Sequence, residues 1–150
     1  MSRRDARKHA FILIFQYPFH QPPAPETHAE LFGFYQDGLP EEESLDKTDE
    51  PYVRRVTEGA LARLDELDGV IARYLKDWQI ERINRIDLAV LRLGVYELLY
   101  EPDIPGGAAI NEAVELAKTY GTDESAAFVN GVLGGVIRAG TAGRRASAGG

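Results

Sequence analysis

The residues of this chain that could do chemistry are mainly cations and carboxylates, and a group of cations stands at its amino-terminal end. Four basic residues accompany a single acid in the first eight positions: Arg3, Arg4, Arg7 and Lys8. Cations in the first turn of a helix oppose the helix dipole, so they do not serve helix stability. They form either a solvated helix end or a contact for an anion such as an RNA phosphate.

The side chains that usually carry catalysis or bind metals are not arranged for either task. The sequence has no cysteine, which excludes disulfides, thiol catalysis and thiolate zinc sites, and which suits a reducing cytoplasm. Its histidines, His9, His20 and His28, have no second set of ligands in their neighbourhoods. Glu112 and Glu115 could form an acid–base pair, but they have no further catalytic partner. We therefore predict no enzymatic activity, no metal and no cofactor.

The chain of 150 residues is acidic, with a formal net charge of −7. A protein with this charge does not attract nucleic acid through its overall field, so an RNA contact would depend on the basic amino-terminal end. No apolar stretch approaches the roughly 20 residues needed to cross a bilayer. The apolar run from Phe11 to Phe15 is too short for a signal peptide and no cleavage site follows it. We predict a cytoplasmic protein without membrane contact.

Hydrophobic periodicity predicts an all-α fold, a compact bundle of about seven helices. Apolar residues recur every three or four positions, and no segment alternates as a strand would. The most densely apolar segment, residues 80–100, should form the central helix. The last two helices should lie within residues 104–137, joined by a short turn at Gly121. The other predicted helices are 3–17, 26–35 and 51–78.

We predict one domain over residues 1–139. The acidic stretch 41–50 is expected to be a solvated loop, and the small, basic residues 140–150 a flexible tail. In the first helix five large apolar residues follow one another, and a single helix face cannot bury all of them. Ile12 is the one expected outside, covered either by another helix or by a second copy of the chain in a homodimer.

Two side chains on the predicted helices need a partner or a place in the core. Burying Arg92 unpaired would cost several kcal/mol, so it requires a carboxylate, or an exit to solvent or to a ligand. Phe128 stands at the edge of a buried stripe of valine and leucine residues. Its ring therefore either completes the core or is presented to a ligand.

Several segments then occur in a characteristic order. A basic start, Arg3 to Arg7, is followed by Ile86 to Leu98 (IDLAVLRLGVYEL), Asp103 to Pro105 (DIP), Ala109 to Lys118 (AINEAVELAK) and Phe128 to Leu133 (FVNGVL). Together they resemble the bacterial NusB family of transcription antitermination factors. The resemblance covers about residues 3–138.

The resemblance implies two helical subdomains and a function in binding rather than catalysis. The implied partners are a NusE-like ribosomal protein, boxA-type single-stranded RNA of nascent ribosomal RNA transcripts, and the RNA polymerase antitermination complex. That complex suppresses premature termination of transcription. Glu124 matches a family position beside the RNA, where an acid is expected to restrain affinity. Carried over by position, the RNA-binding residues are Arg3, Arg4, Arg7, Tyr74, Arg92, Ser125 and Phe128.

Two alternatives to this function remain open. One is a helical protein–protein interaction module whose basic end is merely solvated. The other is a stand-alone ribosomal RNA-binding module without a role in antitermination, because a similar helical domain begins a family of ribosomal RNA cytosine methyltransferases. Lys8 and Ile12 depart from the family pattern, in which acidic and polar residues are common at these positions.

Overall fold

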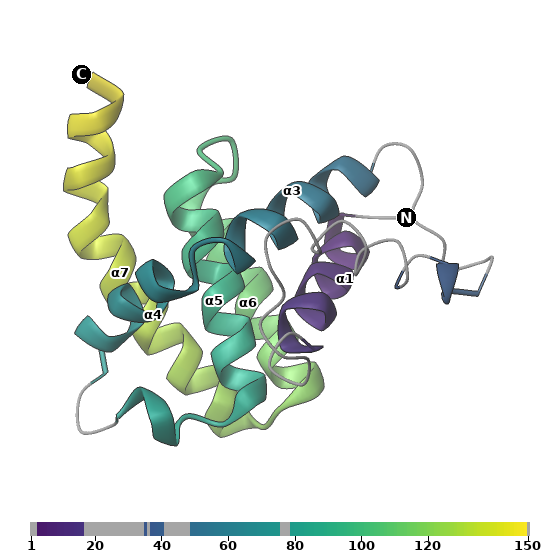
Figure 1. The fold of residues 1–150 in the computed structure, drawn as a ribbon. Coiled ribbons are helices and arrows are strands. Elements are labelled where there is room, and N and C mark those ends of the chain that lie inside the picture. Colours follow the sequence, from purple (N-terminus) through teal and green to yellow (C-terminus); the bar gives the residue numbers. More distant parts are fainter. Residues whose placement is uncertain (1–2, 17–34, 36, 41–48, 76–78, 150) are drawn as a thin grey trace. The chain divides into compact units, whose positions relative to one another are not determined.

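The computed structural model describes residues 3–16, 35, 37–40, 49–75 and 79–149 (Figure 1). These residues form six α-helices and one 3-10 helix, with no strand among them, which confirms the all-α class. They fall into two compact units, Met1–Arg63 and Leu64–Gly150. Residues 26–34 of the helix predicted over 26–35, and most of the acidic loop, lie outside the described residues. No helix in the described part of the chain is both long and apolar enough to cross a bilayer.

The first unit is built on two helices that pack against each other, α1 (Arg3–Gln16) and α3 (Glu50–Leu61). Within the apolar run 11–15, Ile12 and Phe15 are both half-buried and the other three are buried, so Ile12 is not the one residue left further out. His9 is buried and its Nδ1 is hydrogen-bonded to the hydroxyl of Tyr35. The apolar core side chains of the two helices are Ala6, Ala10, Phe11, Leu13 and Ile14 from α1, and Tyr52, Val53, Val56, Ala60 and Leu61 from α3.

The single long helix predicted over 51–78 is wrong, because α3 ends at Leu61 and a separate helix, α4 (Leu64–Arg73), follows. At the break the amide of Arg63 donates to the carbonyl of Ala60 (3.0 Å), three residues back. The Arg63 guanidinium Nη1 donates to the carbonyl of Gly59 (3.1 Å), which the main chain of a continuing helix would have bonded. A side chain thus satisfies a carbonyl that the helix end would otherwise leave without a partner.

The second unit contains α4, the 3-10 turn η4 (Ile80–Arg82), α5 (Arg85–Tyr100), α6 (Gly106–Tyr120) and α7 (Asp123–Gly149). Helix α5 contacts α4, α6 and α7, which confirms its central position within this unit. Its core side chains include Val90, Leu91, Leu93, Val95 and Leu98, which are at most 3% exposed.

Two predicted boundaries in this unit need correction. Helix α5 does not begin at Ile80, because residues 80–82 form only the short turn η4. It begins after Asn84, whose side-chain oxygen accepts a hydrogen bond from the amide of Asp87 (2.8 Å) and so caps the helix. At the other end, α7 continues to Gly149 through the residues predicted to form a flexible tail. Alanine and arginine, which recur in this segment, are strong helix formers; whether the segment is flexible stays a prediction.

Helices α6 and α7 are joined by the two residues Gly121 and Thr122, as the sequence predicts. The amide of Gly121 donates to the carbonyl of Ala117 (2.8 Å) and ends α6. A Cβ on Gly121 would lie 2.7 Å from Ser125 Oγ and 2.8 Å from the oxygen of Ala117, so this position has no room for a side chain. Thr122 Oγ1 accepts from the amide of Ser125 (3.1 Å) and caps the start of α7.

We expect Gly121→Ala to lower the free energy of unfolding by about 1–3 kcal/mol, because the added methyl group meets a main-chain oxygen that cannot move aside cheaply. The measurement is urea denaturation followed by circular dichroism. Gly131→Ala is the matched control, since a Cβ there has nothing within 4 Å. In a helix that control should be neutral or stabilising by up to about 1 kcal/mol. Equal effects of the two substitutions would contradict the close approach.

Candidate nucleic-acid interface

The seven residues that the resemblance assigns to RNA are divided between the two units. The first unit holds those on α1, and the second holds those on α5 and α7 and the one that directly follows α4. The first group is Arg3, Arg4 and Arg7, and the second is Tyr74, Arg92, Ser125 and Phe128.

The arginines of the first unit have different environments although they share one helix. Arg3 and Arg4 are exposed in the first turn of α1. The Arg3 guanidinium carbon lies 4.2 Å from the centroid of the Tyr52 ring, in a cation–π contact, and that ring is only 1% exposed. Arg7, one turn further on, is itself only 7% exposed. The accessible cationic end of α1 therefore depends on Arg3 and Arg4, and a phosphate contact of Arg7 stays a prediction.

Arg92 has a carboxylate partner within the second unit. Its Nε donates to Asp68 Oδ1 and its Nη2 to Asp68 Oδ2, both at 2.8 Å, so the two side chains form a bidentate ion pair between α5 and α4. The arginine side chain is 12% exposed and the aspartate side chain 27%. The sequence predicts that Arg92 needs a carboxylate or an anionic ligand, but it does not identify Asp68.

Tyr74 follows the last residue of α4 and is half-buried. Its ring lies beside the backbone of α7 at Gly135, where a Cβ would come within 2.8 Å of the ring carbon Cδ1. The missing side chain of Gly135 thus makes room for the ring. Part of the tyrosine side chain remains accessible to solvent or to a ligand.

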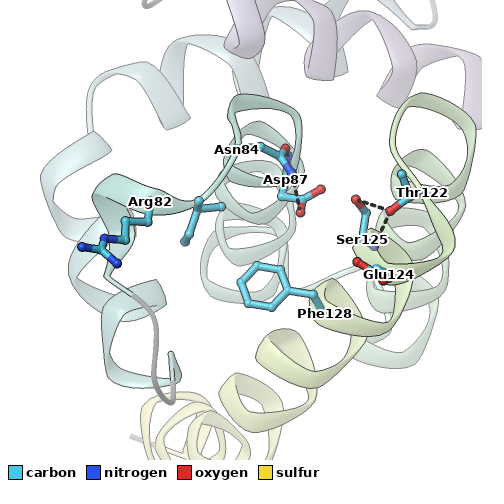
Figure 2. A pocket seen from close by; sticks show the side chains of 8 residues that line it. Arg82, Asn84, Asp87, Thr122, Glu124, Ser125 and Phe128 are labelled. Carbon is cyan, nitrogen blue, oxygen red and sulfur yellow. Dashed lines mark hydrogen bonds between the residues drawn. The ribbon is translucent and has the colours of Figure 1, made fainter.

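Ser125 and Phe128 lie together at a pocket of about 410 Å³. Figure 2 shows the Phe128 ring projecting from α7 into this pocket, across from the segment that leads into α5. Phe128 is half-buried, whereas the neighbouring stripe of Val129, Val132 and Leu133 is at most 3% exposed. The ring is therefore part of the pocket wall and does not belong to the buried stripe. The lining residues are Arg82, Ile83, Asn84, Asp87, Thr122, Glu124, Ser125 and Phe128.

Apart from Arg82 on η4, the polar groups of the pocket come from the starts of α5 and α7. Asp87 is 6% exposed; its Oδ2 accepts from Asn84 Nδ2 (3.0 Å), and its Oδ1 is buried without a hydrogen-bond partner. Ser125 Oγ lies 3.3 Å from Thr122 Oγ1. Two acids, Asp87 and Glu124, stand against the single cation Arg82, so the pocket is unsuited to a phosphate. An aromatic ring beside hydroxyl and amide groups fits a nucleobase better.

Four lining residues besides Ile83 were not identified from the sequence: Arg82, Asn84, Asp87 and Thr122. Two of them are helix caps that a search for capping patterns could have found. Asn84 stands three residues before Asp87 and directly before an apolar helix, and Thr122 stands directly before the acidic first turn of α7.

We expect Arg92→Gln to lower the free energy of unfolding by about 1–3 kcal/mol, because Asp68 loses both charge-assisted hydrogen bonds in a largely buried place. Chemical denaturation of Arg92→Gln, Asp68→Asn and the double variant measures the coupling between the two side chains. Lys118→Gln is the control: its pairing with Glu115 is exposed, and its loss should cost less than about 0.5 kcal/mol. Fully additive effects of the Arg92 and Asp68 substitutions would contradict the ion pair.

Known proteins resemble the chain over nearly its whole length. It is 38% identical over 138 residues to the transcription antitermination protein NusB of Acetivibrio thermocellus, which covers 92% of this chain and 90% of that protein. It is 41% identical over 141 residues to the protein of the same name from Clostridium botulinum, covering 91% and 100%.

Solved structures agree with these relatives. NusB of T. maritima superposes with a TM-score of 0.79 at 37% identity, covering 92% of both chains. A chain from the crystal structure of the antitermination factors NusB and NusE in complex with dsRNA superposes with a TM-score of 0.77 at 28% identity, covering 91% of this chain and 96% of that one. The NusB family model matches residues 4–138. The chain therefore belongs to the NusB family.

Proposed function

We propose that this protein is a transcription antitermination factor that binds RNA together with a NusE-like ribosomal protein. It acts in the cytoplasm by binding and performs no catalytic step. Its target is boxA-type single-stranded RNA of nascent ribosomal RNA transcripts, and its complex with RNA polymerase suppresses premature termination. The observation that carries this proposal is the match, over residues 4–138, to the family whose relatives bear this function in their names.

The pocket of the second unit supports recognition of an unpaired base. The solved relative is in complex with double-stranded RNA. In a duplex, however, the faces of the bases are stacked on one another, so an aromatic side chain reaches a base face only where the strand is single. The half-buried ring of Phe128, in a pocket of about 410 Å³, has room for one base to stack on it. Ser125, whose side chain lines the same pocket, would contact that base.

The remaining assigned residues would serve the RNA backbone. Arg3 and Arg4 are exposed cations at a helix start, where phosphate contacts add affinity without sequence preference. Arg92 donates hydrogen bonds from Nε and Nη2 to Asp68. Its remaining N–H groups would donate to a phosphate. Tyr74, whose half-buried ring lies beside α7, would contact the RNA with its accessible part. Arg7 would act mainly by holding α1 in place, since little of it is accessible.

Fluorescence titration of a boxA RNA, with and without the NusE-like partner, tests the proposed function. We expect weak binding by the isolated protein and much tighter binding by the pair, with affinity falling steeply as salt rises because phosphate contacts release counterions. A complex that forms with the partner but shows no preference for boxA over a random strand would contradict the proposal. That result would favour a module for protein–protein contact.

Replacing the pocket ring tests the role of Phe128. We expect Phe128→Leu to weaken boxA binding by up to about 1–3 kcal/mol, the range for loss of one base–aromatic stack, and to affect a random strand less. Thermal unfolding should change little, because the ring is not part of the buried stripe. Val132→Ala, within that stripe, is the control that should lower stability and spare the RNA contact. If Phe128→Leu lowers stability and spares RNA binding, the ring belongs to the core.

A further inference from the structure

We infer that Asp68, on α4, is a positioning residue for RNA binding. It holds the guanidinium group of Arg92, on α5, so that one edge of that group is available to an RNA phosphate. The inference rests on the proposed RNA binding and names a residue that neither the sequence pattern nor the resemblance assigns. Both residues belong to the second unit. An acid near an RNA-binding surface is ordinarily expected to weaken binding, so the inference reverses the expected sign of its effect.

A guanidinium group has two edges that can each donate two parallel hydrogen bonds, one formed by Nε and Nη2 and the other by Nη1 and Nη2. Asp68 occupies the first edge of Arg92, since Nε donates to Oδ1 and Nη2 to Oδ2, both at 2.8 Å. Within the described part of the chain, Arg92 makes no other hydrogen bond or ion pair. Its second edge, which includes both N–H groups of Nη1, therefore remains available to a ligand.

This second edge belongs to a side chain that is only 12% exposed. Donors in a largely buried place that lack an acceptor raise the free energy of the folded protein, and an acceptor on a ligand removes that cost. A phosphate offers two oxygens that match the spacing of a guanidinium edge, which is why arginine binds this group through two hydrogen bonds. An RNA phosphodiester thus fits the second edge of Arg92.

Asp68 has two opposing effects on such a contact. Its charge repels the phosphate, but both of its oxygens already accept hydrogen bonds from Arg92, and its side chain is only 27% exposed. In return, it fixes an arginine side chain whose rotatable bonds would otherwise have to be ordered when RNA binds. The guanidinium group is held between two helices that pack against each other, α4 and α5. We expect this preorganisation to outweigh the repulsion.

The pair Asp68→Asn and Asp65→Asn tests the inference, because each removes one negative charge from α4, and Asp65 is exposed. Each full-length variant, in complex with the NusE-like partner, is titrated with boxA RNA and with a random strand of equal length over a series of salt concentrations. We expect Asp68→Asn to weaken binding of both strands by the same factor, on the order of threefold to tenfold. The slope of log affinity against log salt should fall by about one, although no cation has been removed. Asp65→Asn should stay within about twofold of the wild type.

A double variant shows whether Asp68 acts through Arg92. We expect Arg92→Gln to lose at least as much RNA affinity as Asp68→Asn, and the double variant to bind like Arg92→Gln alone, because the carboxylate then has no guanidinium group to position. Additive losses would overturn the inference. Binding of RNA by Asp68→Asn as tightly as by the wild type, or more tightly, would also overturn it, since Asp68 would then only compete with the phosphate.

Further measurements separate the possible failures. Every titration is run below the onset of thermal unfolding, and a loss of affinity for the NusE-like partner without RNA would overturn the positioning role. Arg92→Lys keeps the charge and can still pair with Asp68, but an ammonium group has no second planar edge. It should bind RNA at least about threefold more weakly than the wild type, and equal binding would contradict the inference. If Arg92→Gln binds boxA like the wild type, the inference is wrong and the proposed function stands. If the wild-type complex itself shows no preference for boxA, the proposed function fails.

Discussion

The close approach between Gly121 and the carbonyl oxygen of Ala117 determines how α7 leaves α6. At Gly121 the main chain leaves the helical conformation (φ −117°, ψ −130°), and Thr122 caps the next helix. The first two turns of α7 then carry Ser125 and Phe128 to the pocket, across from the Asn84 cap of α5. The two-residue turn at Gly121 and Thr122 thus brings the two candidate RNA-binding residues of α7 close to the end of α6.

The pocket lies beside two capped helix starts, and the caps affect which ligand it can bind. A bare helix start attracts phosphate through its free amide groups. Here Asn84 and Thr122 occupy amides of both starts, and Asp87 and Glu124 place acids in both first turns. The pocket is consequently more favourable for an uncharged ring than for an anion. In the proposed function, bases are recognised in the second unit, while the exposed arginines of the first unit contact the RNA backbone.

The sequence predicted those features that depend on spacing along one helix. The all-α class, the central position of α5 in its unit and the edge position of Phe128 follow from apolar periodicity. The turn at Gly121 follows from the frequency of glycine at helix ends. The break after Leu61 could not be predicted, because Ala60, Leu64 and Leu67 keep the apolar spacing across it and the Arg63 side chain stabilises it. Asp68, the partner of Arg92, lies on another helix 24 positions away, and a pairing between helices leaves no periodic signal.

The net charge of −7 limits how such a chain can bind RNA. Its overall field repels a phosphate backbone, so attraction must come from cations that act within about one Debye length, roughly 8 Å at physiological salt. Several arginines are already committed to the fold: Arg54 to Glu50, Arg63 to a main-chain carbonyl and Arg92 to Asp68. Others, such as Arg3 and Arg4 on α1, are exposed. A surface with few phosphate contacts binds RNA weakly by itself, which is a physical reason for the proposed function to require a second RNA-binding protein.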